Sequence, residues 1–327
     1  MKILVTGGAG YIGSHAVKVF LEHGLDVWVY DNLSFGHAAA VPQERLIVAD
    51  LAEHERLATI FREKKIEAVV HFAAYAYVGE SVEHPFKYYR NNVINTLTLL
   101  ETMQACGVGK IVFSSTCATY GNPEKIPISG ATPQQPINPY GRTKLMMEWA
   151  MADAARAHGL AYAALRYFNA AGADPSGELG EDHDPESHLI PLVLQTIMGQ
   201  RPSVSIFGTD YPTPDGTCIR DYIHVHDLAF AHLRALERLQ PGQGLCLNLG
   251  TGRGYSVREV IDVCSDVTGS PVNFVEASRR PGDPPALVAC AEDAYRLLDW
   301  QPAYPSLHEI VETAWRWHRS HPHGYDD

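Results

Sequence analysis

Short apolar runs alternate with longer amphipathic stretches through the first half of the chain. Between the first two runs, residues Ile12–His23 place apolar side chains at helical spacing, and Gly24 follows where a helix C-terminal cap is expected. Strands that alternate with helices in this way are typical of a parallel sheet. The runs that predict β-strands are Lys2–Thr6, Val27–Tyr30, Leu46–Val48, Ala68–Phe72, Lys110–Ser114 and Tyr162–Arg166.

The pattern changes after Ala171. Residues 172–185 are rich in Gly, Asp, Pro and Glu, and residues 208–216 form a second stretch of breakers, so both predict irregular structure. Residues 220–239 again have the pattern of a strand followed by a helix. We therefore expect an α/β fold with a nucleotide-binding domain over 1–171, rejoined by about 217–243, and a smaller discontinuous α/β domain over 172–216 and 244–327.

Charge and composition narrow the possible partners. The chain has 327 residues and a net charge of −12, which disfavours nucleic acid and anionic membranes as partners. No apolar run approaches the ~18 residues of a membrane helix, and the N-terminus lacks the apolar core of a signal peptide. Six widely spaced cysteines indicate reduced thiols, so we predict a cytoplasmic protein. The histidine-rich stretch Asp221–Asp227 has no further ligands at metal-site spacing, and no metal is expected.

A glycine-rich loop follows the first predicted strand and opens the first helix. Gly7, Gly10 and Gly13 stand where the backbone must turn tightly and approach a pyrophosphate, whose charge is stabilised by the helix N-terminus. Asp31 ends the next strand, where a carboxylate can accept both ribose hydroxyls. Because Asp31 would repel a 2′-phosphate and Asn32 offers no guanidinium, the sequence favours NAD over NADP. The expected fold is a Rossmann-type doubly wound parallel sheet.

The stretch Asn138–Lys144 places Tyr140 and Lys144 one helical turn apart, so that the phenol and the ammonium share a face. A nearby ammonium favours the phenolate, which would let Tyr140 act as a base. Upstream, the predicted strand ending at Ser114 continues into Thr116, which brings hydroxyls to the carboxyl edge of the sheet, where such folds bind ligands.

Ten motifs in order carry a resemblance to a known family over nearly the whole chain. They read TGGAGYIGSH, DNLSFG, HFAAYAYVGESV, YYRNNV, FSSTCATYG, NPYGRTK, LRYFNAAGADP, DGTCIRDYIHVHDL, NLGTG and RRPGD. These motifs resemble the extended short-chain dehydrogenases/reductases and, among them, the UDP-glucose 4-epimerase family. The resemblance implies a tightly held NAD that takes hydride from C4 of a UDP-sugar and returns it to the other face of the 4-keto sugar. It also implies a homodimer built on helices equivalent to Asn92–Cys106 and Tyr140–His158.

The same resemblance assigns roles to individual residues. Tyr140 would be the base, Lys144 would hold the nicotinamide ribose and lower the pKa of Tyr140, and Thr116 would bond the 4-oxygen. The residues implied to contact NAD are Gly7, Gly10, Tyr11, Ile12, Gly13, Asp31, Asn32, Asp50, Leu51, Phe72, Ala73, Asn92, Ser114, Tyr140, Lys144 and Tyr167. Those implied to hold the UDP-sugar are Thr116, Asn169, His188, Leu189, Arg220, Arg280, Asp283 and Leu287.

Several assignments keep a structural alternative. Asp50 could cap a helix over Leu51–Phe61, Asn92 could cap another helix, Arg280 could be a solvated surface charge, and Leu287 could point into the core.

Three positions depart from the usual family pattern. Ala76 stands where many members have a lysine near the cofactor, and His188 stands where an asparagine often lines the substrate pocket. We align Leu287 with the position whose size is associated with acceptance of N-acetylated sugars.

Three alternative functions are weighed as well. Local motifs such as AYVGES and GTCIRDYI resemble the UDP-arabinose/UDP-xylose 4-epimerases, which leaves the sugar open. A dehydratase or decarboxylase is disfavoured because no acidic residue follows Thr116 at Cys117 or Ala118. A non-catalytic NAD-binding regulator is disfavoured because Tyr140 and Lys144 are both present.

Overall fold

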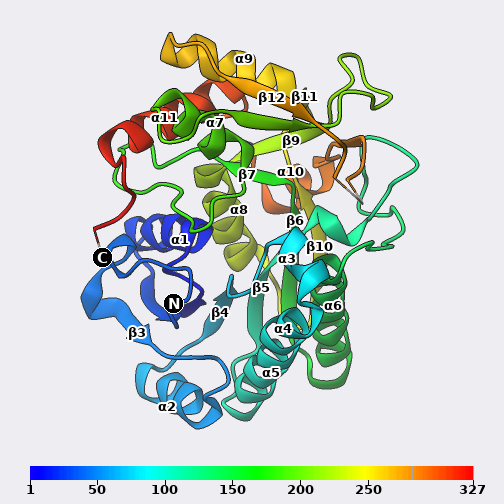
Figure 1. Cartoon of the computed structure of the whole chain (residues 1–327). Coiled ribbons are helices and arrows are strands. Elements are labelled where there is room, and N and C mark those ends of the chain that lie inside the picture. The colour runs from blue at the N-terminus through cyan, green and yellow to red at the C-terminus, as the bar shows by residue number, and fades with distance from the viewer. Residues whose placement is uncertain (281–282, 327) are drawn as a thin grey trace.

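A computed structural model describes residues 1–280 and 283–326. Within these residues, a seven-stranded parallel sheet has the order β10-β6-β5-β4-β1-β2-β3. Helices cover both of its faces (Figure 1). The strands are β1 (Lys2–Thr6), β2 (Asp26–Asp31), β3 (Leu46–Val48), β4 (Ala68–His71), β5 (Lys110–Thr116), β6 (Ala161–Tyr167) and β10 (Gly244–Leu249). The helices on its faces are α1 (Tyr11–Glu22), α2 (His54–Lys64), α5 (Asn95–Ala105), α6 (Pro139–His158) and α8 (Val225–Arg238).

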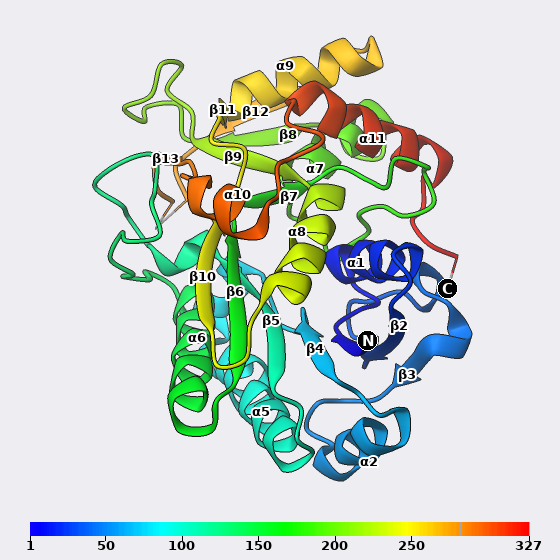
Figure 2. The same ribbon diagram turned by 180° about the vertical axis from the view of Figure 1, so that it is seen from behind.

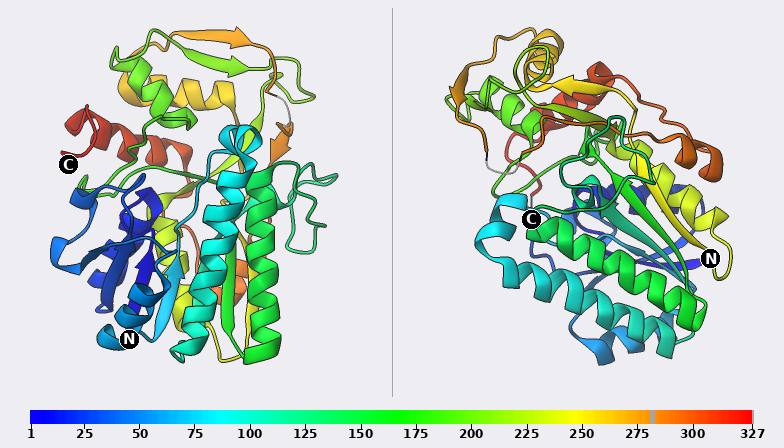
Figure 3. Two further views of the ribbon diagram at one scale, coloured as in Figure 1. Left: turned by 60° about the horizontal axis from the view of Figure 1, so that its bottom comes forward. Right: turned by 90° about the vertical axis from the view of Figure 1, so that its right-hand side faces the viewer.

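The alternation of side chains along β1 divides the core into two layers. Ile3 and Val5 pack with α1 and α8 on one face, whereas Leu4 packs with α2, α5 and α6 on the other. All three side chains are fully buried. The long helices α5 and α6 lie side by side on the outside of the molecule (Figure 3).

A smaller unit lies beyond the carboxyl ends of these strands (Figures 1 and 2). Strand β9 pairs with β7, β11 and β13, and β8 pairs with β12. Helices α7, α9 and α11 pack together in a core of their own. The bounds are β7 (Asn169–Ala171), β8 (Val204–Phe207), β9 (Ile219–His224), β11 (Gly254–Ser256), β12 (Phe274–Ala277), β13 (Ala286–Leu287), α7 (Leu189–Ile197), α9 (Val257–Thr268) and α11 (Leu307–Ser320).

Shorter elements complete the described chain. Helix α10 (Glu292–Leu298) packs against α8 and β10, while α3 (Val78–Glu83), α4 (Pro85–Tyr88) and a π-helical turn (Tyr89–Ile94) lead into α5. Single 3₁₀ turns occupy Ala38–Ala40, Gln43–Arg45 and Cys117–Thr119. Among the described helices, none is long and apolar enough to cross a membrane.

The expected strands of the first half are all present, and four of them, β2, β4, β5 and β6, have bounds that differ from the prediction by one or two residues. Two further features differ from the sequence prediction. Helix α2 begins at His54 and not at Leu51, because Asp50 accepts the N–H of Ala52 at 2.8 Å and holds these residues in a turn. The segment 217–243 contributes helix α8 to the large sheet, but its strand β9 belongs to the smaller sheet. The strand that rejoins the large sheet is β10, just after the predicted range, while the domain boundaries themselves stay a prediction.

Candidate active site

The glycine loop after β1 forms a cradle that fits a dinucleotide pyrophosphate. A Cβ on Gly7, whose φ is +71°, would lie 2.4 Å from the backbone nitrogen of Ala73, and one on Gly13 would lie 2.1 Å from the carbonyl oxygen of Gly7. The loop can therefore pack this closely only as glycine. Helix α1 begins after Gly10 with no side-chain cap and no acidic residue in its first turn, so its first N–H groups suit an anion.

Asp31 lies against this loop, as predicted from its place at the end of β2. Its carboxylate is 8% exposed and accepts the N–H of Ala9 and that of Leu33, each at 2.9 Å. Burial raises its pKa, and the two N–H donors oppose this shift. Each carboxylate oxygen keeps a second acceptor position, which fits a pair of ribose hydroxyls.

The residues next to Asp31 at the carboxyl edge of the sheet contact one another or the core. The Asn32 amide donates to the Asp50 carboxylate at 2.7 Å, and Leu51 is buried beneath them in the core. On the other side of the loop, the backbone N–H groups of Phe72 and Ala73 donate to the carbonyl of Thr6 at 2.8 and 3.0 Å. A cofactor role for these residues remains a prediction.

Asn92 is fully buried in the π-helical turn and bridges two segments. Its amide donates to the Tyr75 carbonyl at 3.0 Å and to the Thr143 hydroxyl at 3.1 Å, and its oxygen accepts the Tyr75 N–H at 2.9 Å. Asn92 thus holds the loop after β4 against helix α6. Its expected contact with the cofactor stays a prediction.

The three residues expected to carry the chemistry meet where β5 ends and α6 begins. The Thr116 side chain lies close enough to the Tyr140 phenol to favour a lower pKa of that phenol, and its oxygen accepts the N–H of Ala118 at 3.1 Å. Lys144 is 2% exposed, and its Nζ donates to the Ser114 carbonyl at 2.7 Å and lies 5.9 Å from the centre of the Tyr140 ring. The structure therefore brings these three residues together, and their roles in the chemistry stay a prediction.

Two further hydroxyls lie beside them. Ser114 and Tyr167, from the neighbouring strands β5 and β6, form a hydrogen bond with each other. Their expected contact with the cofactor stays a prediction.

Burial dominates the protonation of the pair. It raises the pKa of Tyr140 well above its usual value, and the nearby Thr116 side chain only partly opposes this. It also lowers the pKa of Lys144 to about 7, against the attraction of the Glu148 carboxylate. Burial thus opposes ionisation of the phenol, whereas positive charge beside it favours ionisation. The expected effect of Lys144 and of a nicotinamide cation on Tyr140 stays a prediction.

Glu148, which the sequence analysis overlooked, is the centre of a buried polar network behind Lys144. The Arg166 guanidinium forms a bidentate pair with its carboxylate at 2.6 and 2.9 Å. The hydroxyl of Ser115 and the amide of Gln134 also donate to it. The sequence does contain a signal, because Tyr140, Lys144 and Glu148 follow one another at intervals of four on one helix face.

Residues expected to hold the UDP group gather across the site on the smaller unit. Arg220 on β9 pairs with Asp283 at 2.7 Å, so the structure brings two of the predicted residues together. Arg280 is exposed and stacks on the Phe207 ring at 4.0 Å, while Pro281 and Gly282 of the same motif lie outside the described residues. Asn169 lies on β7, beside Tyr222 of β9.

Leu287 is 8% exposed and packs with Cys117, Tyr120 and Phe168. It therefore belongs to an apolar cluster that adjoins Thr116 through Cys117. Whether it contacts the sugar stays a prediction.

His188 is the N-cap residue of α7, directly before Leu189, and its side chain is 46% exposed. Its Nδ1 lies 2.7 Å from the Glu181 carboxylate. His183, which the sequence analysis overlooked, lies beside the same carboxylate and meets the Tyr11 ring edge-on at 6.0 Å. This cluster thus connects the predicted substrate segment to the glycine loop.

Comparisons with known proteins agree on one family. Residues 3–250 match the NAD dependent epimerase/dehydratase family. The chain is 57% identical to a UDP-glucose 4-epimerase of Halalkalibacterium halodurans, covering 99% of this chain and 98% of that one.

Two solved structures have the same fold. A UDP-glucose 4-epimerase from Brucella ovis in complex with NAD gives a TM-score of 0.93 at 50% identity, covering 96% of this chain and 97% of that one. One from Stenotrophomonas maltophila with bound NAD and formylated UDP-arabinopyranose gives 0.94 at 41% identity, covering 98% and 99%. Sequence and fold therefore agree that this chain belongs to the UDP-glucose 4-epimerase family.

Proposed function

We propose that the protein interconverts UDP-glucose and UDP-galactose by oxidising C4 of the sugar and reducing it again on the opposite face. The observation that carries this proposal is the grouping of Thr116, Tyr140 and Lys144 beside the glycine loop. Relatives that carry the name UDP-glucose 4-epimerase match this chain over nearly its whole length, which favours this sugar pair over the alternatives.

NAD fits the cradle made by the glycine loop and Asp31. When bound, it takes up hydride from C4, returns it, and brings a positively charged ring next to Tyr140. The first turn of α1 would hold the pyrophosphate and Asp31 the adenosine ribose. Lys144, fixed by Ser114, has N–H donors left for the nicotinamide ribose.

Tyr140 would move the proton. Its phenolate accepts the proton of the 4-hydroxyl, and its phenol returns it when the keto sugar is reduced. Thr116 holds the 4-oxygen close to the Tyr140 oxygen, and Glu148 keeps more of the positive charge on Lys144 than burial alone would allow. Arg220 and Arg280 suit the diphosphate, because a guanidinium pairs with its oxygens bidentately.

The purified protein incubated with UDP-galactose tests this proposal. Formation of UDP-glucose, together with a reduced-nicotinamide absorption band near ~340 nm, is the expected result, because the band reports oxidation at C4. If neither the product nor the band forms with NAD bound, the proposed reaction is wrong.

Exchanging the adenosine-ribose contact should change cofactor choice. In Asp31→Ser/Asn32→Arg, the ratio of NADP to NAD affinity should rise about 10-fold or more, since a carboxylate is lost and a charged hydrogen bond of ~1.5–3 kcal/mol is gained. Titration of both cofactors measures the ratio. Asp31→Asn is the matched control, because it removes the charge without adding a guanidinium, while its amide oxygen can still accept one of the two loop N–H groups. An unchanged ratio in the double variant would assign cofactor choice to other residues.

The apolar wall at Leu287 should select against N-acetylated sugars. We expect activity on UDP-hexoses, appreciable activity on UDP-xylose/UDP-arabinose, since a small missing group costs ~1–3 kcal/mol, and weak activity on UDP-N-acetylhexosamines. Leu287→Ala should raise the activity on UDP-N-acetylhexosamines, because the shorter side chain leaves room for the acetamide group. Kinetics on the three sugar pairs test this. Ile128→Ala removes a buried side chain from the same cluster and should not raise it. Equal efficiency on plain and N-acetylated hexoses in the wild type would exclude the steric argument.

We also propose a homodimer formed through α5 and α6. Ile94 and Leu97 at the start of α5 are 55% and 41% exposed, and Met146 and Trp149 on α6 are 39% and 58% exposed. Large apolar side chains on two adjacent helices favour a partner surface. Light scattering on the purified protein measures the assembly, and a monomer at micromolar concentration would contradict it.

A cytoplasmic role in galactose metabolism fits the proposed reaction. All six cysteines are free thiols, three of them at half-buried positions, as a reducing compartment permits. Fractionation of the source cells tests the location, and recovery outside the cytoplasm would exclude it.

A further inference from the structure

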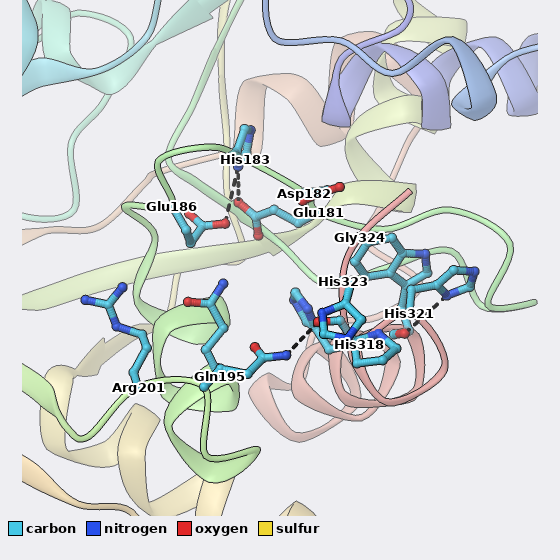
Figure 4. A pocket seen from close by; sticks show the side chains of 13 residues that line it. Glu181, Asp182, His183, Glu186, Gln195, Arg201, His318, His321, His323 and Gly324 are labelled. Carbon is cyan, nitrogen blue, oxygen red and sulfur yellow. Dashed lines mark hydrogen bonds and ion pairs between the residues drawn. The ribbon is translucent and has the colours of Figure 1, made fainter. Parts of the chain in front are cut away.

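Four potential metal ligands converge in the irregular segment before α7. They are Glu181, His183, Glu186 and His188, and one ligand atom from each lies within 4.8 Å of the others. Figure 4 shows the His183 ring turned toward the Glu181 and Glu186 carboxylates, with a dashed line to each. The sequence predicts no metal at the histidine-rich stretch Asp221–Asp227, and this cluster lies elsewhere in the chain. The spacing of the residues 181–188 matches no common ligand motif, and only the fold of this segment brings them together.

Three separations within the cluster are longer than an ordinary hydrogen bond. His183 Nδ1 lies 3.4 Å from Oε1 of Glu181 and 3.4 Å from Oε2 of Glu186. His188 Nδ1 lies 3.3 Å from Oε1 of Glu186, the oxygen that also accepts the N–H groups of Ser187 and His188. Metal–ligand bonds of ~2.0–2.2 Å in a tetrahedron place neighbouring ligand atoms roughly 3.4 Å apart. The pair His188 Nδ1 and Glu181 Oε1, at 2.7 Å, would separate slightly on binding.

Two of these ligand atoms are buried and face only other members of the cluster. Within the part of the chain that the structure describes, Glu181 Oε1 and His183 Nδ1 have as polar contacts the ion pairs given above and no further hydrogen bond. Glu181 as a whole is only 4% exposed. These ion pairs require protons on the imidazoles, and a metal ion at the centre would take the place of those protons.

We propose that Glu181, His183, Glu186 and His188 bind one divalent transition-metal ion of the zinc class. Two imidazole nitrogens and two carboxylate oxygens are donors that Zn²⁺ accepts in tetrahedral sites. Two carboxylates with two neutral imidazoles also balance the charge of the ion. A cavity of about 390 Å³ between α7 and α11 adjoins Glu181, His183 and Glu186, and gives an ion a route from solvent.

A metal here would act on the predicted substrate segment. Bound through Nδ1, His188 would carry its proton on Nε2, and that N–H would be a fixed donor at the start of α7. This consequence rests on the proposed function. Removal of the metal should then raise KM for the UDP-sugar more than it lowers kcat.

Metal titration of the full-length protein tests the site without reference to activity. After chelation and dialysis, the wild type should bind one equivalent of Co²⁺ per chain with the visible bands of a tetrahedral complex, and Zn²⁺ should displace it. His183→Gln and Glu186→Gln should weaken Co²⁺ binding by about 10-fold or more, the scale on which altered metal sites lose affinity. His321→Gln, which changes the same cavity outside the four ligands, should bind like the wild type.

Zn²⁺ should also raise the melting temperature of the wild type and of His321→Gln. If the wild type binds no Co²⁺ at micromolar concentration, or if the ligand variants bind it equally well, the cluster consists of ion pairs only and the proposal fails. The wild-type spectrum decides this even where a variant does not fold. If the wild type binds the metal but its KM for the UDP-sugar is the same before and after chelation, only the proposed link to the substrate is contradicted.

Discussion

Tyr140→Phe should reduce turnover by about 10²–10⁴-fold, the contribution typical of general acid–base catalysis, while NAD stays bound. The phenol oxygen is the only atom removed, and it lies close to the Thr116 side chain at the edge of the sheet. Steady-state rates with UDP-galactose, together with the NAD content of the purified variant, measure the effect.

Tyr162→Phe is the matched control for this change. Tyr162 lies on β6 and is 9% exposed, and it pairs with Ile111 on β5, five residues before Thr116 and the carboxyl end of the strands. Its variant should turn over close to the wild-type rate. Turnover of Tyr140→Phe close to the wild type would remove Tyr140 from the mechanism.

Arg166→Met should lower the free energy of unfolding by about 3–5 kcal/mol, because it leaves the Glu148 carboxylate buried without its cation. The side chains of Arg166 and Glu148 are only 6% and 4% exposed, and the guanidinium also donates to the Tyr120 hydroxyl at 2.9 Å. Urea unfolding monitored by circular dichroism measures the loss.

Two further variants separate the buried charge from other effects. Arg166→Met combined with Glu148→Met should recover much of the stability, since replacing both charges with apolar groups removes the unpaired ion. Arg156→Met breaks the exposed pair with Asp153 and should cost at most about 1 kcal/mol. A cost for Arg166→Met as small as that of Arg156→Met would mean that the buried pair does not stabilise the fold.

Local pattern predicts most of the large sheet. β1 and β3 have the predicted bounds, and α1 is displaced by one residue, with Gly24 at φ +76° ending it as expected. Apolar periodicity and glycine caps are local signals, and the parallel sheet follows from their alternation. Strand β9 was assigned to the wrong sheet because its apolar pattern shows that it is buried but does not show which strands it pairs with.

The candidate site also contains features that local sequence predicts and features that depend on tertiary structure. The spacing of Tyr140 and Lys144, and the place of Asp31, could be read from the chain because each depends on one helix or one strand end. The lowered pKa of Lys144 could not be predicted from the sequence, because it depends on burial by neighbouring elements. The cluster around Glu181 and His188 was missed because an irregular segment has no periodicity from which to infer which side chains converge.

The most direct test of the account is the reaction of UDP-galactose in D₂O, with the UDP-glucose product examined by NMR. If C4 is oxidised and reduced by one hydride held in the protein, that hydrogen never exchanges with solvent, and the product keeps protium at C4. Deuterium at C4 would show that the hydrogen leaves as a proton and would contradict hydride transfer as the central step.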